Sequence, residues 1–159
     1  MLFDPRQGVL ISADALWEQG FGVVFQELEG ESAFDDVAQV LDLIESLDAR
    51  WVIPGHGAPF QDVAGALHLA RQRLAVFRAD PARHARHGIK VLVKYHLMEE
   101  RRQPWSDFED WFCATPLCQR VWQRLGQPEG SLAAFGHRLA HDLVRGGAVL
   151  LRDGVLHDA

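Results

Sequence analysis

The sequence predicts an α/β fold in two parts. Strand and helix patterns alternate over residues 1–80, and residues 81–159 carry a mainly helical pattern. The chain has 159 residues, which is enough for one compact domain or two small ones. Apolar residues make up 48% of it and charged residues 24%, a balance typical of soluble globular proteins. The alternation stops at Asp80-Pro81, so we expect the boundary there.

The first part begins with a predicted hairpin. Leu2-Phe3 and Val9–Ser12 are short apolar runs, and the turn between them contains Pro5 and Gly8. The first strand has hardly begun when the chain starts, which makes it resemble a cut edge. A glycine-bearing loop of large apolar residues, Gly20–Phe25, follows the hairpin.

A helix, a strand and a second helix complete the first part. Apolar residues recur at steps of three and four over residues 34–47, which predicts an amphipathic helix, and Ser32 with Asp35 resembles a capping box at its start. Trp51–Ile53 predicts a short buried strand. Asp62 is placed to cap a second helix, which ends where the first part ends.

The second part is predicted to contain helices followed by a terminal hairpin. The helices are expected around Ile89–His96, from Ser106, from Thr115-Pro116 and over Ser131–Arg145. Val149–Leu156 predicts the hairpin, with Asp153-Gly154 as its tight turn. Helices followed by a hairpin are the pattern of a winged helix.

Composition narrows the function classes. No apolar run approaches the ~18 residues that cross a bilayer, and the N-terminus has no basic region followed by an apolar one. We therefore expect a cytoplasmic protein in which Cys113 and Cys118 are reduced, semi-buried side chains. The net charge of −6 argues against a general nucleic-acid binder, although it leaves room for a local basic face.

Two residues at predicted strand ends are candidate metal ligands. Asp14 follows the strand that ends at Ala13, and a carboxylate there can bridge two divalent ions; alternatively it caps the turn before Ala15–Trp17. His56 stands between two glycines after Trp51–Ile53, where an imidazole can bind a metal. The alternative for His56 is a hydrogen bond to a backbone carbonyl in a tight turn.

Other side chains favour structural roles. His137 and His141 are four residues apart, a spacing that can bind a metal, but they lie beside the apolar face of their helix. His84 and His87 are expected at a solvated helix start, and His96 in the core. The aromatic series expected in the core comprises Trp105, Phe108, Trp111, Phe112 and Trp122.

A second aromatic group has a different setting. Trp17, Phe21 and Phe25 follow Asp14 on the glycine-bearing loop. They can wall a substrate pocket or form a contact surface for another subunit.

Around Asp14 and His56 the sequence resembles the metallo-β-lactamase superfamily, in particular its glyoxalase II-like and ribonuclease-like hydrolases. Ser12–Leu16 is similar to the family's strand-end turn with a metal-bridging aspartate. Ile53–Gly57 is similar to its strand-end Pro-Gly-His, whose histidine binds the second metal. The resemblance covers about residues 1–80, and the helix between the motifs agrees with it. The rest resembles the winged-helix C-terminal region of one branch.

The resemblance implies the C-terminal half of an αββα sandwich, with few strands and two helices, over residues 1–80, and a winged-helix-like domain over residues 81–159. In the intact family site two divalent metals (zinc, manganese or iron) generate hydroxide and polarise the group attacked. The family's His-x-His-x-Asp-His motif has no counterpart here. We therefore expect Asp14 and His56 to be a partial ligand set that binds metal weakly or not at all.

Three hypotheses follow. The chain is a part of an ester, thioester or phosphodiester hydrolase and is inactive by itself. Alternatively, its winged-helix-like region is a binding or oligomerisation module for protein or nucleic acid. Third, a missing N-terminal half leaves one sheet face exposed, and we expect self-association as a two-fold dimer to cover it; the sequence does not decide whether an N-terminal half is supplied in trans. The basic residues of the winged-helix-like module are Arg138, Arg145 and Arg152. The apolar residues expected in the dimer interface are Leu2, Val9, Ile11, Phe21 or Phe25.

Overall fold

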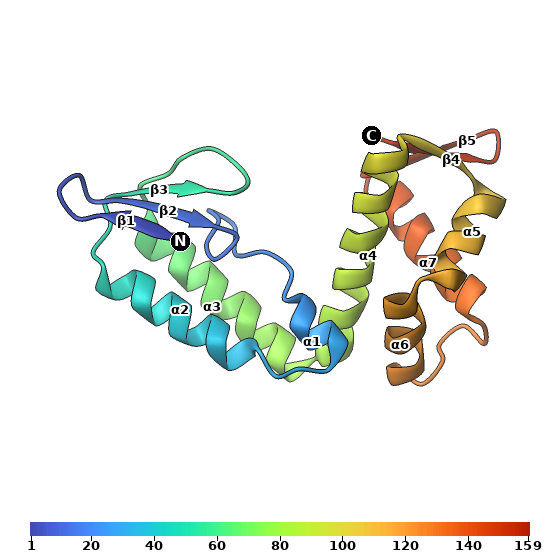
Figure 1. The fold of residues 1–159 in the computed structure, drawn as a ribbon, viewed down its shortest axis with the longest axis horizontal. Helices are drawn as coiled ribbons and strands as arrows, with labels where there is room; N and C mark the ends of the chain where they lie inside the picture. Colours follow the sequence, from blue (N-terminus) through green and yellow to red (C-terminus); the bar gives the residue numbers. More distant parts are fainter. The chain divides into compact units, whose positions relative to one another are not determined.

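The computed structural model describes all 159 residues and contains seven helices and two three-stranded sheets. The predicted α/β class is therefore confirmed. The chain divides into two compact units (Figure 1). Unit 1 comprises Met1–Glu27 and Glu31–Pro81, and unit 2 comprises Leu28–Gly30 and Ala82–Ala159.

Unit 1 is built on one small sheet. Strands β1 (Leu2–Asp4), β2 (Val9–Ala13) and β3 (Trp51–Pro54) lie in the order β1-β2-β3. The predicted hairpin is confirmed, because β1 and β2 pair antiparallel. Strand β3 returns parallel to β2, so both strands end at the same edge of the sheet.

The helices of unit 1 cover one face of this sheet. These are α2 (Phe34–Ser46) and α3 (Val63–Ala79), and the short α1 (Phe25–Glu29) precedes them (Figure 1). The core forms because alternate strand residues and one stripe of each helix are apolar. Its fully buried members include Leu10, Leu16, Leu41, Ile44, Val52 and Ala70.

The caps of these helices confirm one prediction and correct another. Asp62 caps α3 by accepting a hydrogen bond from the Gly65 amide. The expected capping box at α2 is wrong, because its N-cap residue is Ala33 and makes no side-chain cap. The Glu27 carboxylate accepts hydrogen bonds from the Ala33 amide at 2.6 Å and the Phe34 amide at 2.8 Å. A carboxylate from the preceding helix thus satisfies the free N–H groups of α2. The sequence around the start of α2 does not predict this cap, because Glu27 lies six residues before Ala33.

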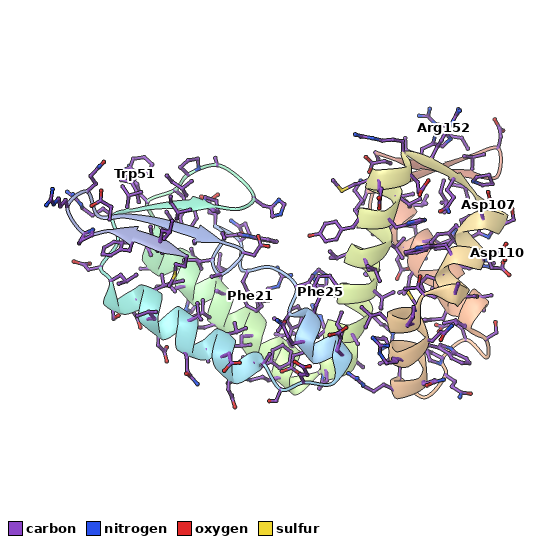
Figure 2. The ribbon with its side chains drawn as sticks, in the orientation of Figure 1. Phe21, Phe25, Trp51, Asp107, Asp110 and Arg152 are labelled. Atoms are coloured by element: carbon purple, nitrogen blue, oxygen red, sulfur yellow. The ribbon has the colours of Figure 1, made fainter.

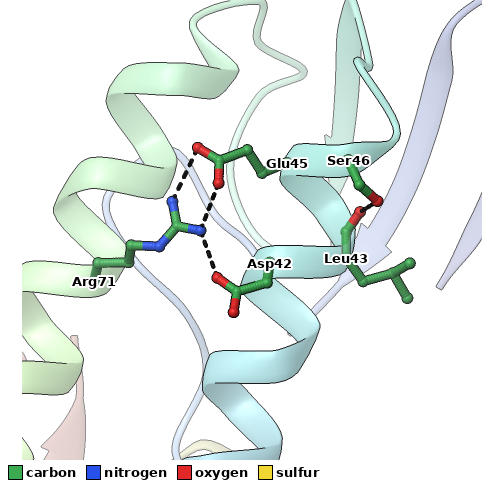
Figure 3. A network of polar contacts seen from close by, with 5 residues as sticks. All are labelled: Asp42, Leu43, Glu45, Ser46 and Arg71. Carbon is green, nitrogen blue, oxygen red and sulfur yellow. Dashed lines mark hydrogen bonds and ion pairs between the residues drawn. The ribbon is translucent and has the colours of Figure 1, made fainter.

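An exposed ion network joins α2 to α3. Arg71 of α3 donates to Asp42 at 2.7 Å and to Glu45 at 2.9 and 3.3 Å (Figure 3). The hydrogen bond to Asp42 is the largest cause of the raised pKa of Arg71, followed by the hydrogen bond to Glu45. Because these side chains face solvent, each pair contributes at most about 1 kcal/mol.

Unit 2 combines helices with a second small sheet. Its elements are α4 (Pro81–Glu100), β4 (Arg102–Pro104), α5 (Trp105–Ala114), α6 (Pro116–Arg124), α7 (Leu132–Arg145), β5 (Val149–Arg152) and β6 (Val155–Asp158). The sheet has the order β4-β6-β5, with both pairs antiparallel. Strand β4 lies outside the predicted elements, because Arg102–Pro104 has no alternating apolar pattern and forms a strand through its antiparallel pairing with β6.

Several predicted local features of unit 2 are confirmed. Pro116 occupies the first turn of α6, and the Ser131 side chain caps α7 by accepting from the Ala134 amide. Asp153 and Gly154 both have positive φ, +49° and +74°, as a tight hairpin turn requires. Phe108, Phe112 and Phe135 are fully buried between α5 and α7.

The predicted solvation of His84 is wrong. Its side chain is 2% exposed. Helix α4 begins at Pro81, so the buried row of Ile89, Val93 and Leu97 extends back through Ala85 to His84.

None of the seven helices combines the length and apolar composition that a membrane-spanning helix needs.

Candidate functional site

The structure brings Asp14 and His56 together at one edge of the unit 1 sheet. Asp14 directly follows β2, and His56 lies two residues beyond the end of β3. Because the two strands are parallel neighbours, their carboxyl ends meet, and Asp14 Oδ1 lies 3.9 Å from His56 Nε2. Both side chains remain accessible, with 68% of Asp14 and 61% of His56 exposed.

The turn after β2 is held by Ser12. This buried residue donates from Oγ to the Leu16 carbonyl at 2.6 Å, and its own carbonyl accepts from the Ala15 amide at 3.2 Å. Ala13 has a φ of +50°, a strained conformation for a residue with a side chain. The Ala15 amide in this turn is therefore bonded to the Ser12 carbonyl and not to the Asp14 side chain. The Asp14 carboxylate faces His56.

Two glycines make room for Asp14. A Cβ atom on Gly55 would lie 2.8 Å from Asp14 Oδ1 and 3.1 Å from the Ala13 carbonyl carbon. A Cβ atom on Gly22 would lie 2.9 Å from the Asp14 Cβ. Both glycine amides also donate hydrogen bonds of 2.9 Å, Gly55 to the Ala13 carbonyl and Gly22 to the Asp14 carbonyl. The backbone therefore closes around Asp14 from two sides, which only glycine permits.

Trp17 packs against His56. Their ring centroids are 5.0 Å apart in an edge arrangement with an interplanar angle of 78°. Trp17 is fixed by paired backbone hydrogen bonds with Gly20, of 2.6 and 3.3 Å. Its indole Nε1 is buried without a hydrogen-bond partner. Of the three aromatic residues expected near the site, Trp17 is thus the one in contact with a candidate ligand.

Phe21 is buried beside a cavity, whereas Phe25 is half-buried on α1. Phe21 is 2% exposed and lines a cavity of about 320 Å³ that Asp14 also lines. The pocket role thus agrees with its placement, whereas a buried ring offers little contact surface to another subunit. Arg73 lies over Phe21 and Phe77, 5.5 and 5.3 Å from the ring centroids, and burial lowers the pKa of Arg73. Phe25 is half-buried on α1.

Asp14 and His56 do not by themselves form a catalytic metal centre. Catalytic zinc sites use three protein ligands and one open position. The structure holds no group of three or more His, Cys, Asp or Glu side chains arranged to bind a metal ion. The two residues therefore fit one part of such a centre, and no catalytic step through a metal follows from this chain.

The remaining candidate side chains make contacts within unit 2. Trp105 Nε1 donates to His137 Nε2 at 3.0 Å, and the same nitrogen of His137 lies 2.8 Å from Glu109 Oε2. His96 stacks on Trp111 with centroids 3.7 Å apart. Cys113 and Cys118 are free thiols. Burial is the largest cause that raises the pKa of the Cys118 thiol, to about 12.

The comparisons with known proteins give little further identification. The sequence matches no family model and no curated protein sequence. A solved structure of a metallo-beta-lactamase family protein from Thermus thermophilus is similar at a TM-score of 0.36 and 18% identity. The match covers 99% of this chain and 44% of that chain, so this chain spans less than half of its length. A likeness at this level establishes neither a family nor a function.

Proposed function

We propose that this chain is the C-terminal portion of a metal-dependent hydrolase of the metallo-β-lactamase superfamily. In the intact protein the substrate is an ester, a thioester or a phosphodiester, and the isolated chain is inactive. In this proposal residues 1–80 are the C-terminal half of the αββα sandwich and residues 81–159 the winged-helix-like region. Asp14 and His56 are two of the ligands of a centre that holds two divalent metals.

The observation that carries this proposal is the convergence of Asp14 and His56, whose side-chain atoms lie 3.9 Å apart. They come from positions 42 residues apart in sequence and meet at the ends of adjacent parallel strands. The strained φ of Ala13 and the close approach of Gly55 hold Asp14 at this edge. Strain of this kind is concentrated at functional sites.

A bare apolar sheet face also supports the proposal. Leu2, Ile11 and Ile53 form one row across the sheet and are 70%, 46% and 41% exposed. Trp51 is 42% exposed on the face turned away from α2 and α3 (Figure 2). These neighbouring apolar side chains would lose their contact with water if another layer packed on this face. We propose that the remaining part of the sandwich packs here.

The size of this face favours another part of the same protein over a second copy. Three short strands with ~4.8 Å between them and ~3.3 Å per residue give a footprint of roughly 200 Å². A stable interface between separate proteins needs about 800 Å² per partner. A homodimer through this face is the competing proposal. Light scattering at tens of micromolar separates the two, because only a dimer would double the measured mass.

Metal binding tests the site itself. Addition of Mn²⁺ should broaden the NMR signals around Asp14 and His56 at high metal concentration, and Asp14→Asn or His56→Gln should abolish this effect. Asp48→Asn is the matched control, because Asp48 is an exposed carboxylate in the turn that follows α2. Broadening that survives both site variants would refute the assignment of the two ligands.

Activity and gene context test the rest of the proposal. Ester, thioester and phosphodiester substrates should not be turned over by the isolated chain with added zinc or manganese. Chelator-sensitive turnover that requires Asp14 would contradict the inactivity. The DNA upstream of Met1 should encode an in-frame His-x-His-x-Asp-His.

We propose as a second candidate that unit 2 is a protein-binding module. The observation that favours it is the uneven charge: residues 82–159 contain eleven Lys and Arg against nine Asp and Glu, whereas residues 1–81 contain five against thirteen. Arg138, Arg145 and Arg152 are all exposed, although Arg145 is paired with Asp142. This excess is small for nucleic acid. Salt-dependent binding of short RNA or DNA would contradict the protein-binding assignment.

A further inference from the structure

The cavity beside Asp14 has an apolar floor. It lies within unit 1, between the loop after Gly20 and helix α2, and its volume is about 320 Å³. Phe21, Val24 and Ala33 line it and are only 2%, 8% and 9% exposed. A concave site with a buried apolar floor is the usual form of a small-molecule pocket, and this volume lies near the lower end of the range of about 300–1,000 Å³ for such pockets.

The rim of the cavity is acidic. Asp14, Glu31 and Asp36 line it with exposed carboxylates, whereas Gln26 and Ser32 add neutral polar groups. No lysine, arginine or histidine is among its lining residues. The rim therefore presents three carboxylates, of which Asp14 lies 3.9 Å from His56 outside the cavity, whereas Glu31 and Asp36 have no cationic side chain beside them among the lining residues.

We propose that this cavity binds a small organic cation, with an apolar body of about ten heavy atoms that ends in an ammonium group. One water molecule occupies roughly 30 Å³ of liquid, so the cavity of about 320 Å³ has room for about ten heavy atoms, which sets this size. The body covers the floor around Phe21, which removes apolar surface from water. The ammonium remains at the hydrated rim among the carboxylates, because a charge buried on the floor would lose its hydration.

This site goes beyond the proposed hydrolase function, since it requires no metal and no second part of the protein. Its ligand is selected by charge complementarity at the rim and by the length of the apolar body. A neutral ligand with the same body keeps the hydrophobic contact and loses the rim attraction. An anionic ligand meets three like charges and is excluded.

Three matched probes test the proposal on the full chain without metal: 4-phenylbutylammonium, 4-phenylbutanol and 4-phenylbutyrate. NMR titration should show saturable shifts at Gly22, Ser32 and Val37 with the ammonium probe. The ammonium probe should bind about tenfold more tightly than the alcohol at low ionic strength, as expected for a few exposed charge contacts. The carboxylate should not bind, and added salt should remove the advantage of the ammonium.

Variants of the lining residues test whether the probes bind in this cavity. Asp36→Asn should reduce the preference for the ammonium over the alcohol, and Val37→Phe should block both probes by filling the cavity. Asp48→Asn is the control, because it removes one exposed charge outside the cavity at a position whose φ of +48° suits asparagine.

Three outcomes would overturn the proposal: equal affinities for the ammonium and the alcohol, shifts confined to residues outside the cavity, or equal effects of the Asp36 and Asp48 variants. The metal titration depends on variants of Asp14 and His56 and on line broadening, whereas this test depends on variants of Asp36 and Val37 and on chemical-shift changes. Failure of one proposal therefore leaves the other to be judged by its own result.

Discussion

Replacing Gly55 by alanine tests whether the backbone is closed around Asp14. The new Cβ would lie 2.8 Å from Asp14 Oδ1 and 3.1 Å from the Ala13 carbonyl carbon. Real Cβ contacts essentially never fall below 3.0 Å, so the Asp14 side chain must move away from the new methyl group. The ends of β2 and β3 must also separate, because the second contact is with backbone. We expect the Asp14–His56 contact to be lost.

The expected stability change follows from two opposing effects. Overpacking costs typically 1–3 kcal/mol. The lower chain entropy of alanine in the unfolded state returns about 0.4–1 kcal/mol. The net loss should therefore be about 1 kcal/mol, or a fall in Tm of roughly 2–4 °C for a chain of this length.

Thermal unfolding followed by circular dichroism measures the loss, and NMR shifts of Asp14 and His56 report the local change. Gly146→Ala is the matched control, because its Cβ would meet its nearest atom at an ordinary 3.4 Å and its φ is −80°. Wild-type stability with unchanged signals at Asp14 and His56 in the Gly55 variant would refute the reasoning.

Three further predictions concern the packing of each unit. Gly136→Ala places a Cβ 2.7 Å from Phe112 Cδ1, so it should destabilise unit 2 by about 1–3 kcal/mol in denaturant unfolding; an unchanged midpoint would contradict the tight α5–α7 packing. Glu27→Ala should lower the free energy of unfolding by about 1 kcal/mol, because it removes the carboxylate that caps α2. Glu27→Gln should cause a smaller loss, because its amide oxygen still accepts hydrogen bonds, and equal losses in the two variants would argue against a charged cap. Burial raises the pKa of the Cys118 thiol from 9.0 to about 12 in the folded state. The unfolded chain therefore loses this proton at a lower pH than the folded chain, beginning near pH 9. Stability should therefore fall between about pH 9 and pH 12, and Cys118→Ala should reduce this dependence; equal slopes in pH-dependent urea unfolding would count against it.

Most secondary structure could be predicted because its signals are local. The apolar periodicity of α2, the Asp62 and Ser131 caps, Pro116 and the Asp153-Gly154 turn each act within a few residues of the element that they define. The errors arose where the partner is remote in sequence. Strand β4 exists because β6 pairs with it, and α2 is capped by Glu27 from another helix.

The sequence by itself determined the α/β class and the change of pattern at Pro81, and it placed Asp14 and His56 at the ends of two strands. Each of these depends on residue type and short spacing. Only the tertiary structure decided that Gly22 and Gly55 enclose Asp14 and that an acidic cavity opens beside it. Those features depend on the parallel register of β2 and β3 and on the path of the loop between Asp14 and α2. Register and loop path are set by the packing of the whole core, which no short stretch of sequence encodes.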